Sequence, residues 1–312
     1  MKIAVLGAGA LGCAMGSCLS EAGHEVWLIN RRTDHVDAMN AYGLTIRVDG
    51  VDRKISVKAA RNAHEISAQA DAVDLIIVLV KSFHTYAAIV SATPIVGPKT
   101  LVLSLQNGLG HEDVLAEVVG REKVVAGKTY AGGVMLGPGH VVRGTKGKET
   151  YIGELDGRVS ERVRHIAELF NAAGLITHIS DNIMGTMWEK LLVNVATGAL
   201  SGITRLNYGD LYQVPDVREC ALAAVKEAID VATASGVRIN VSDPEEPWTK
   251  AASGLPAEFK ASMLQSLEKG SITEVDYING AVVRWGQKYG IPTPVNRTLV
   301  ACLKGIEHGL PG

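Results

Sequence analysis

Hydrophobic positions in the first half of the chain form short unbroken runs rather than an alternating pattern. These runs are rich in Val, Ile and Leu and cover residues 3–6, 26–29, 75–80, 101–105 and 124–126. Such runs are typical of parallel strands that are buried on both faces of a sheet. Helical stretches lie between them, for example residues 11–21, which precede the helix-ending residue Gly23. The β-α-β-α order predicts an α/β fold with a Rossmann-type, doubly wound sheet.

The pattern changes after Thr129, where glycines become frequent. Short strands at residues 140–143 and 150–153 predict an antiparallel extension of the sheet. A helix at residues 159–173 and a strand at 176–179 would complete this domain, which we expect to end near Asp181 and Asn182. The first domain is therefore predicted to cover residues 1–181.

The remaining residues carry helical periodicity and no strand signal. Apolar positions recur with a 3.6-residue period over residues 183–200, 217–235, 256–268, 273–289 and 295–304. Residues 243–247 are polar and contain prolines, which is typical of a loop. We therefore expect an all-helical second domain at residues 182–312.

Composition limits the classes of function that fit the chain. Its 312 residues have a net charge of −2, no run of five like charges and only 5% aromatic residues. This argues against nucleic acid or a membrane surface as a partner. Residues 3–19 are uncharged and resemble a signal peptide, but their four glycines break the apolar segment, and no other segment is long enough to cross a membrane.

Cysteine and histidine usage favours a cytoplasmic protein without a metal. The four cysteines form no C-x-x-C pair, so we expect buried free thiols in a reducing compartment. The nine histidines are scattered and form no H-x-x-x-H pair, so no metal site is predicted. Apolar helices in the second domain would suit a homodimer, although core packing explains the same pattern.

A glycine-rich loop follows the first predicted strand and opens the first predicted helix. It reads G-x-G-x-x-G and consists of Gly7, Ala8, Gly9, Ala10, Leu11 and Gly12. In this context the glycines allow a tight turn, a close approach to a pyrophosphate and close packing of the helix on the sheet. The N–H groups at the helix N-terminus then bind the phosphates, so the loop predicts a dinucleotide site.

The end of the second strand indicates which dinucleotide is bound. A site for NAD usually has an acidic residue there, to accept hydrogen bonds from the adenosine ribose. This chain has Asn30 followed by Arg31, which leaves room for a 2′-phosphate and offers it a charged partner. The predicted cofactor is NADP(H), and Arg32 is interpreted as a solvated charge.

Polar residues follow two further strands of the predicted sheet. Lys81 follows the run at residues 75–80, and Asn107 follows the run at 101–105. Ligands of such sheets bind beyond the carboxyl ends of the strands, so we expect both residues near the cofactor rather than only in turns.

Three segments of the helical domain carry further candidates. Lys190 and Asn194 are four residues apart and share one helix face, which is either solvated or the wall of a cleft. Ser262 lies within the helical stretch expected at residues 256–268. Glu274 has an alternative interpretation, because Ser271-x-x-Glu274 after Gly270 has the form of a capping box.

Taken together, these segments resemble the ketopantoate reductase (2-dehydropantoate 2-reductase) family over nearly the whole chain. The matching positions are Gly7–Gly12, Arg31, Lys81, Gln106-Asn107-Gly108, Trp188-x-Lys190-x-x-x-Asn194, Ser262-Met263-Leu264-Gln265 and Glu274-x-Asp276-Tyr277-Ile278-Asn279-Gly280. The resemblance implies NADPH-dependent reduction of 2-dehydropantoate, a small 2-oxo acid, to (R)-pantoate for pantothenate biosynthesis.

The resemblance also implies roles for individual residues. Lys190 would be the general acid, and Glu274 would hydrogen-bond the substrate hydroxyl and support the charge of Lys190. Asn194 and Ser262 would hold substrate oxygens. Lys81 and Asn107 would line the nicotinamide end, with Asn107 also near the substrate and Glu274 also near the cofactor.

The chain departs from the family pattern at three positions. Gly198 stands where a second Asn is common, Phe259 where Asn or His is common, and Ser266 where Asp is usual. The first two would make the substrate pocket less polar. A reductase for a bulkier or aromatic 2-oxo acid is therefore the nearest alternative, and a non-catalytic NADP(H)-binding sensor is another.

Overall fold

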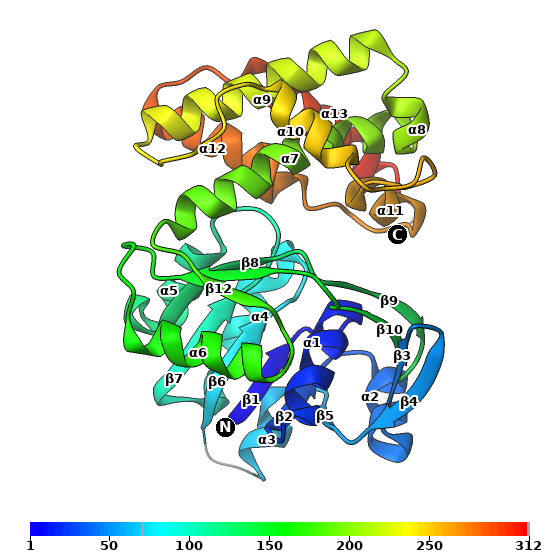
Figure 1. Ribbon diagram of the computed structural model, residues 1–312, viewed down its shortest axis with the longest axis vertical. Coiled ribbons are helices and arrows are strands. Elements are labelled where there is room, and N and C mark those ends of the chain that lie inside the picture. Colours follow the sequence, from blue (N-terminus) through cyan, green and yellow to red (C-terminus); the bar gives the residue numbers. More distant parts are fainter. Residues whose placement is uncertain (70–71, 311–312) are drawn as a thin grey trace. The chain divides into compact units, whose positions relative to one another are not determined.

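The computed structural model describes residues 1–69 and 72–310. The chain divides into two compact units, and Figure 1 follows it from the N-terminal to the C-terminal end. The first unit comprises Met1–Gln106 and His111–Ile183, and the second comprises Asn107–Gly110 and Met184–Gly312. A short segment of the first half, residues 107–110, therefore belongs to the helical second unit.

The first unit is built on an eight-stranded sheet with the order β12-β11-β8-β7-β6-β1-β2-β5. Neighbouring strands are parallel except β8 and β11, which are antiparallel. The strands are β1 Lys2–Leu6, β2 Glu25–Ile29, β5 Lys58–Ala60, β6 Val73–Val78, β7 Val96–Ser104, β8 Val124–Thr129, β11 Thr150–Gly153 and β12 Thr177–Ile179. The predicted Rossmann-type α/β fold is confirmed, and every hydrophobic run of the first half overlaps one of these strands.

A second sheet of four strands was not predicted as such. Its order is β4-β3-β10-β9, formed by β3 Leu44–Val48, β4 Val51–Ile55, β9 Gly132–Gly137 and β10 His140–Gly144. Only β10 has a counterpart among the expected strands. Strand β4 is almost wholly exposed and mostly polar, so it lacks the apolar run that reveals a buried strand.

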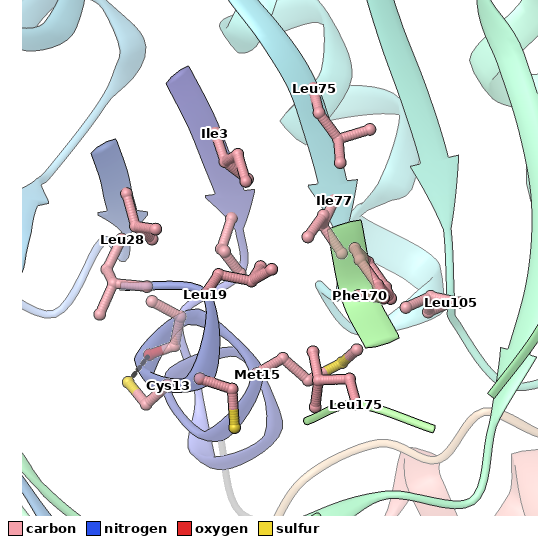
Figure 2. Close-up of a cluster of buried hydrophobic side chains, with 14 of the residues drawn as sticks. Ile3, Cys13, Met15, Leu19, Leu28, Leu75, Ile77, Leu105, Phe170 and Leu175 are labelled. Atoms are coloured by element: carbon pink, nitrogen blue, oxygen red, sulfur yellow. Dashed lines mark hydrogen bonds between the residues drawn. The ribbon is translucent and has the colours of Figure 1, made fainter. Parts of the chain in front are cut away.

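Alternate residues of the central strands enter two separate cores. On β1, Ile3 and Val5 belong to a core with residues of α1 (Ala10–Glu21) and α6 (Glu161–Ala172). Figure 2 shows Ile3 in this core with Met15 and Leu19 of α1 and Phe170 of α6. Ala4 and Leu6 face the opposite core, which holds residues of three other helices, namely α3 (Ala63–Ser67), α4 (Thr85–Ala92) and α5 (His111–Val119). Burial on both faces explains why these strands are apolar throughout. Helix α2 (Thr33–Tyr42) and the short 3₁₀ helices η1 (Ser82–His84), η2 (Thr93–Ile95) and η3 (Arg121–Lys123) complete the unit.

The described part of the second unit is helical, as expected. Its elements are α7 Ile183–Thr204, α8 Tyr208–Leu211, α9 Pro215–Ala234, α10 Glu245–Ala252, α11 Ser262–Glu268, η4 Val275–Tyr277, α12 Asn279–Tyr289 and α13 Pro294–His308. Trp188 of α7 is fully buried, and its ring meets that of Trp285 edge-on at 5.5 Å. No helix in the described residues is long and apolar enough to cross a membrane.

Three expectations for the second unit were wrong in detail. Residues 245–247, expected in a loop, begin helix α10, which buries Trp248 and Ala251 on one face. The helix expected from residue 256 begins only at Ser262, because the chain first makes a turn in which Phe259 N–H donates to the Pro256 carbonyl. The helix expected over 273–289 is divided into η4 and α12.

The expectation of buried thiols holds for only part of the cysteine set. Cys13 and Cys18 of α1 are buried, whereas Cys220 is half-buried and Cys302 on α13 is exposed. No cluster of three or more potential metal ligands occurs among residues 1–69 and 72–310.

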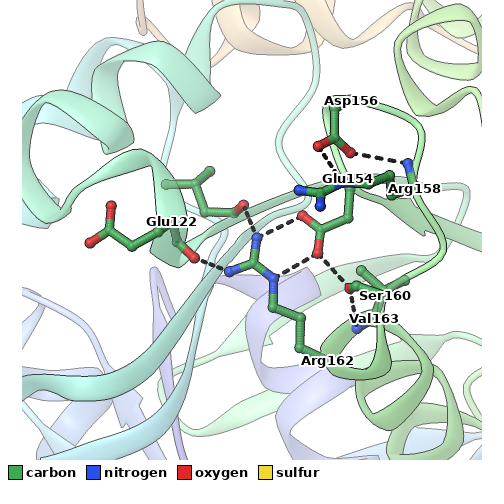
Figure 3. A network of polar contacts seen from close by, with 8 residues as sticks. Glu122, Glu154, Asp156, Arg158, Ser160, Arg162 and Val163 are labelled. Carbon is green, nitrogen blue, oxygen red and sulfur yellow. Dashed lines mark hydrogen bonds and ion pairs between the residues drawn. The ribbon is translucent and has the colours of Figure 1, made fainter.

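An ion pair between a buried carboxylate and a half-buried arginine joins the end of β11 to the start of α6. Glu154 is 6% exposed, and its carboxylate accepts hydrogen bonds from Nε and Nη2 of Arg162, both at 2.6 Å, and from Ser160 Oγ at 2.5 Å. Figure 3 shows that the same guanidinium also reaches the backbone carbonyls of Glu122 and Val124. Burial favours the neutral carboxyl, yet the hydrogen bonds from Arg162 and Ser160 keep the pKa of Glu154 below its ordinary value.

Removal of Arg162 tests this network. Arg162→Ala leaves a buried carboxylate without its charged partner, which should lower the free energy of unfolding by roughly 2–4 kcal/mol. Arg164→Ala is the matched control, since Arg164 lies on the same helix and pairs with the exposed Glu161 at 3.4 Å. The Arg164→Ala control should lower the free energy of unfolding by less than about 1 kcal/mol. Urea unfolding of both variants gives the comparison, and equal losses would contradict the importance of the Glu154–Arg162 pair.

Candidate functional site

The loop between β1 and α1 has the shape expected for a phosphate-binding turn. Gly7 has φ +105°, and a Cβ there would lie 2.5 Å from the backbone nitrogen of Val80. A Cβ on Gly12 would lie 2.4 Å from the carbonyl oxygen of Gly7. Packing inside the protein therefore requires glycine at both positions.

Gly9 is different, because nothing in the described chain lies within 4 Å of an added Cβ. Internal packing therefore does not explain the glycine, whereas a ligand that approaches the backbone closely would. The first hydrogen bond of α1 runs from Cys13 N–H to the Gly9 carbonyl, at 2.9 Å. The N–H groups of Ala10, Leu11 and Gly12 thus have no acceptor within the helix. These donors and the open space at Gly9 fit a pyrophosphate.

The three residues after β2 have different surroundings. Asn30 turns inward, and its Nδ2 donates to the Ala8 carbonyl at 2.7 Å. Arg32 pairs with Asp34 at 2.6 Å, so a carboxylate already neutralises its charge. Arg31 is exposed, and its Nη2 lies 3.1 Å from Nε2 of His84 on η1. In the described chain, no carboxylate forms an ion pair with Arg31.

His84 is a neighbour of Arg31 that the sequence analysis missed. Burial and the charge of Arg31 both lower the pKa of His84, so the imidazole is neutral at pH 7 and can accept the Arg31 hydrogen bond. Lys81, three residues earlier, is exposed and lies at the N-terminal end of η1. The Lys-x-x-His spacing could have suggested that both side chains surround one strand end.

The segment Asn107–Gly110 packs on the backbone of the second unit. Gly108 has φ +93°, and a Cβ there would lie 2.3 Å from the carbonyl oxygen of Tyr277. The same oxygen accepts a hydrogen bond from Leu109 N–H at 3.0 Å. This packing positions Asn107, whose Oδ1 accepts a hydrogen bond from Nζ of Lys190 at 2.8 Å. The structure thus brings together two candidates that are 83 residues apart.

Lys190 and Asn194 both lie on α7 and are half-buried. Within the described chain, Asn194 makes no side-chain hydrogen bond. Glu274 is 8% exposed and lies just before η4, where its carbonyl accepts a hydrogen bond from Tyr277 N–H. Its side chain makes no capping bond, and no helix begins at Ser271, so the capping-box alternative was wrong. Ser262 is the first residue of α11 and is exposed.

Beyond Asn194 the surface of α7 becomes apolar. One turn later, a Cβ on Gly198 would lie 3.3 Å from the terminal methyl of Met263, so this thioether covers the glycine. Thr197 shares a 2.9 Å hydrogen bond with the hydroxyl of Tyr208. The ring of Tyr208 in turn meets that of Phe259 edge-on at 5.1 Å. Gly198 and Phe259, two of the three positions that depart from the family pattern, therefore lie beside a thioether and an aromatic ring, respectively.

Sequence comparison then decides the family. A model of the family described as "Ketopantoate reductase PanE/ApbA" matches residues 3–157, and a model of its C-terminal domain matches residues 182–307. The chain belongs to the ketopantoate reductase family of oxidoreductases.

Individual members of the ketopantoate reductase family match the chain from end to end. The 2-dehydropantoate 2-reductase of Archaeoglobus fulgidus is 33% identical over 99% of both chains. The corresponding enzyme of Halobacterium salinarum is 36% identical over 96% of both. A solved ketopantoate reductase of Ralstonia eutropha has a TM-score of 0.89 and 36% identity, with 99% of each chain covered.

A D-mandelate dehydrogenase is also similar to the chain. Its structure, described as a ternary complex with NADH and anilino(oxo)acetate, has a TM-score of 0.90 and 29% identity and covers 99% of each chain. The fold therefore occurs among relatives named for different substrates.

Proposed function

We propose that this protein uses NADPH to reduce a 2-oxo acid to a 2-hydroxy acid, and that 2-dehydropantoate is its substrate. The observation that carries the proposal is the Lys190 ammonium, which the Asn107 amide holds at 2.8 Å. The curated relatives named 2-dehydropantoate 2-reductase support this choice of substrate. The product would be (R)-pantoate, which would place the protein in cytoplasmic pantothenate biosynthesis.

In this proposal the helical unit supplies the acid chemistry. The nicotinamide, when bound, supplies a hydride to the ketone carbon, and negative charge develops on the ketone oxygen. Lys190 stabilises that charge and donates a proton to the oxygen. Asn107 orients the ammonium, because its amide oxygen accepts one of the three N–H groups. Glu274 and Asn194 hold the substrate hydroxyl and carbonyl region, and Ser262 donates to the carboxylate.

The choice of NADPH depends on Arg31. Asn30 replaces the acidic residue that would repel a 2′-phosphate, and Asp34 already neutralises Arg32. Arg31 is then the cation available to a phosphate at the end of β2, with His84 beside it. A charge-assisted contact of roughly 1.5–3 kcal/mol would favour NADPH over NADH by about 10- to 150-fold.

A second class of substrate is favoured by Gly198 and Phe259, which stand where the family commonly has polar side chains. Met263 lies beside Gly198 and Tyr208 lies beside Phe259, so the surroundings of both positions are apolar. Anilino(oxo)acetate, the ligand of the D-mandelate dehydrogenase relative, carries a phenyl ring that apolar surroundings would suit. A 2-oxo acid with a bulky or aromatic side chain is therefore the alternative.

Substitution of Lys190 tests the proposed acid. Lys190→Ala should lower kcat by about 10²–10⁴-fold, while the Kd for NADPH, measured by fluorescence titration, stays within about twofold. Lys226→Ala is the control, since Lys226 is exposed on α9 and pairs with Asp230. A wild-type kcat in the Lys190 variant would remove this residue from the mechanism.

Substitution of Arg31 tests the cofactor. Arg31→Ala should reduce the ratio of kcat/KM for NADPH to that for NADH by about 10- to 150-fold. Arg32→Ala should change the ratio less than about threefold, because Asp34 already engages Arg32. Equal effects of the two substitutions would show that general positive charge, and not Arg31, sets the preference.

A panel of 2-oxo acids, each assayed with NADPH and NADH, separates the candidate substrates. We expect 2-dehydropantoate to have the highest kcat/KM with NADPH. A higher value for a branched or aromatic acid would assign the enzyme to the alternative substrate class. Tight NADPH binding with no oxidation by any acid would instead indicate a non-catalytic sensor.

A further inference from the structure

The carbonyl oxygen of Ala8, in the middle of the dinucleotide loop, is held by three side chains. Nδ2 of Asn30 donates to it at 2.7 Å, and Nε2 of His35 lies 3.1 Å away. The thiol of Cys13, drawn in Figure 2, donates to it at 3.5 Å. These residues come from the end of β2, from α2 and from α1, so three elements converge on one backbone atom.

The hydrogen bonds of His35 define its tautomer. Its ring is completely buried, and its Nδ1 lies 2.9 Å from the backbone N–H of Gly139. A backbone N–H can only donate, so Nδ1 is the unprotonated acceptor. Burial lowers the pKa of His35, so the ring is neutral at pH 7 and carries its single proton on Nε2. That proton points to an acceptor, the Ala8 carbonyl.

Gly139 gives the ring a fixed support. It lies in the turn between β9 and β10, has φ +66°, and its carbonyl accepts a hydrogen bond from Thr45 N–H at 2.8 Å. The second sheet is thus connected to the dinucleotide loop through one imidazole, which accepts at one nitrogen and donates at the other. His35 is 27 residues from Ala8 and 104 residues from Gly139.

The orientation of the Ala8 carbonyl affects cofactor binding for a simple reason. The peptide group is planar, so fixing this oxygen also fixes the plane of the bond that leads to Gly9. Gly9 accepts the first hydrogen bond of α1, after which Ala10, Leu11 and Gly12 present their N–H groups. A carbonyl that turned outward would instead bring a partial negative charge to the phosphates.

We propose that His35 is a positioning residue for the dinucleotide, and that its Nε2–H and the Asn30 amide together hold the Ala8 carbonyl away from the pyrophosphate. The inference rests on the cofactor binding proposed above. It differs from the role of Arg31, because both NADPH and NADH contain the pyrophosphate. Loss of this support should therefore weaken the binding of NADPH and of NADH by the same factor.

Two substitutions of His35 separate its two hydrogen bonds. Gln places an amide N–H near the position of Nε2 and keeps the donor to Ala8, whereas Asn places an oxygen near Nδ1 and keeps only the acceptor for Gly139. His35→Asn should raise the Kd for NADPH and for NADH by the same factor, about fivefold or more. His35→Gln should stay within about twofold of the wild type, although the melting temperature falls in both variants. With saturating NADPH, kcat should be unchanged.

Several outcomes would overturn the inference. Equal Kd values for the Asn and Gln variants would mean that His35 only stabilises the fold. A change limited to NADPH would mean that His35 acts on the 2′-phosphate and not on the pyrophosphate. If His35→Asn does not fold, Asn30→Ala removes the other strong donor to Ala8 at a half-buried site. Unchanged affinity for both nucleotides in that variant would contradict the proposal. A wild-type protein that binds neither nucleotide would instead overturn the proposed function itself.

Discussion

A close contact between two backbones determines where Asn107 lies. Gly108 approaches the Tyr277 carbonyl so closely that a Cβ would be 2.3 Å from the oxygen, and Leu109 donates a hydrogen bond to the same atom. The Asn107–Gly110 segment is therefore attached to η4, the short helix that begins immediately after Glu274. The hydrogen bond from Lys190 to Asn107 then links α7 to the same place. The absence of a side chain at Gly108 thus allows the close contact that positions Asn107, the hydrogen-bond partner of Lys190.

Much of the architecture could be predicted, because the strongest patterns have a single physical explanation. Val, Ile and Leu runs such as residues 3–6 are apolar on both faces, and the structure buries β1 in two different cores. The turn between β1 and α1 could also be predicted from its glycines, since Gly7 and Gly12 meet backbone atoms at distances that exclude a Cβ. Long helices such as α7 could be predicted from the 3.6-residue period of their apolar positions alone.

The errors arose where tertiary contacts override local pattern. Residues 245–252 contain acids and a proline, yet two apolar residues, Trp248 and Ala251, are buried on one face and stabilise a helix there. The Ser271-x-x-Glu274 spacing matches a capping box, but Glu274 lies before a 3₁₀ turn and does not cap it. Strand β4 is polar and is recognised only by its pairing with β3. Contacts such as His35 with Ala8 follow no fixed sequence spacing and could not have been foreseen.

The two hydrogen bonds of Asn30 have a consequence for how coenzyme preference can evolve. Its Nδ2 donates to the Ala8 carbonyl, and its Oδ1 accepts the backbone N–H of Arg32 at 2.9 Å. An aspartate here, the residue that typically recognises the ribose of NADH, would keep the acceptor but direct a negatively charged oxygen at a carbonyl. A lineage that changed coenzyme would need a compensating change nearby, such as a new donor to Ala8, before the acidic residue became tolerable. Under the proposed preference for NADPH, a change at Asn30 would therefore alter the geometry of the loop and the cofactor preference together.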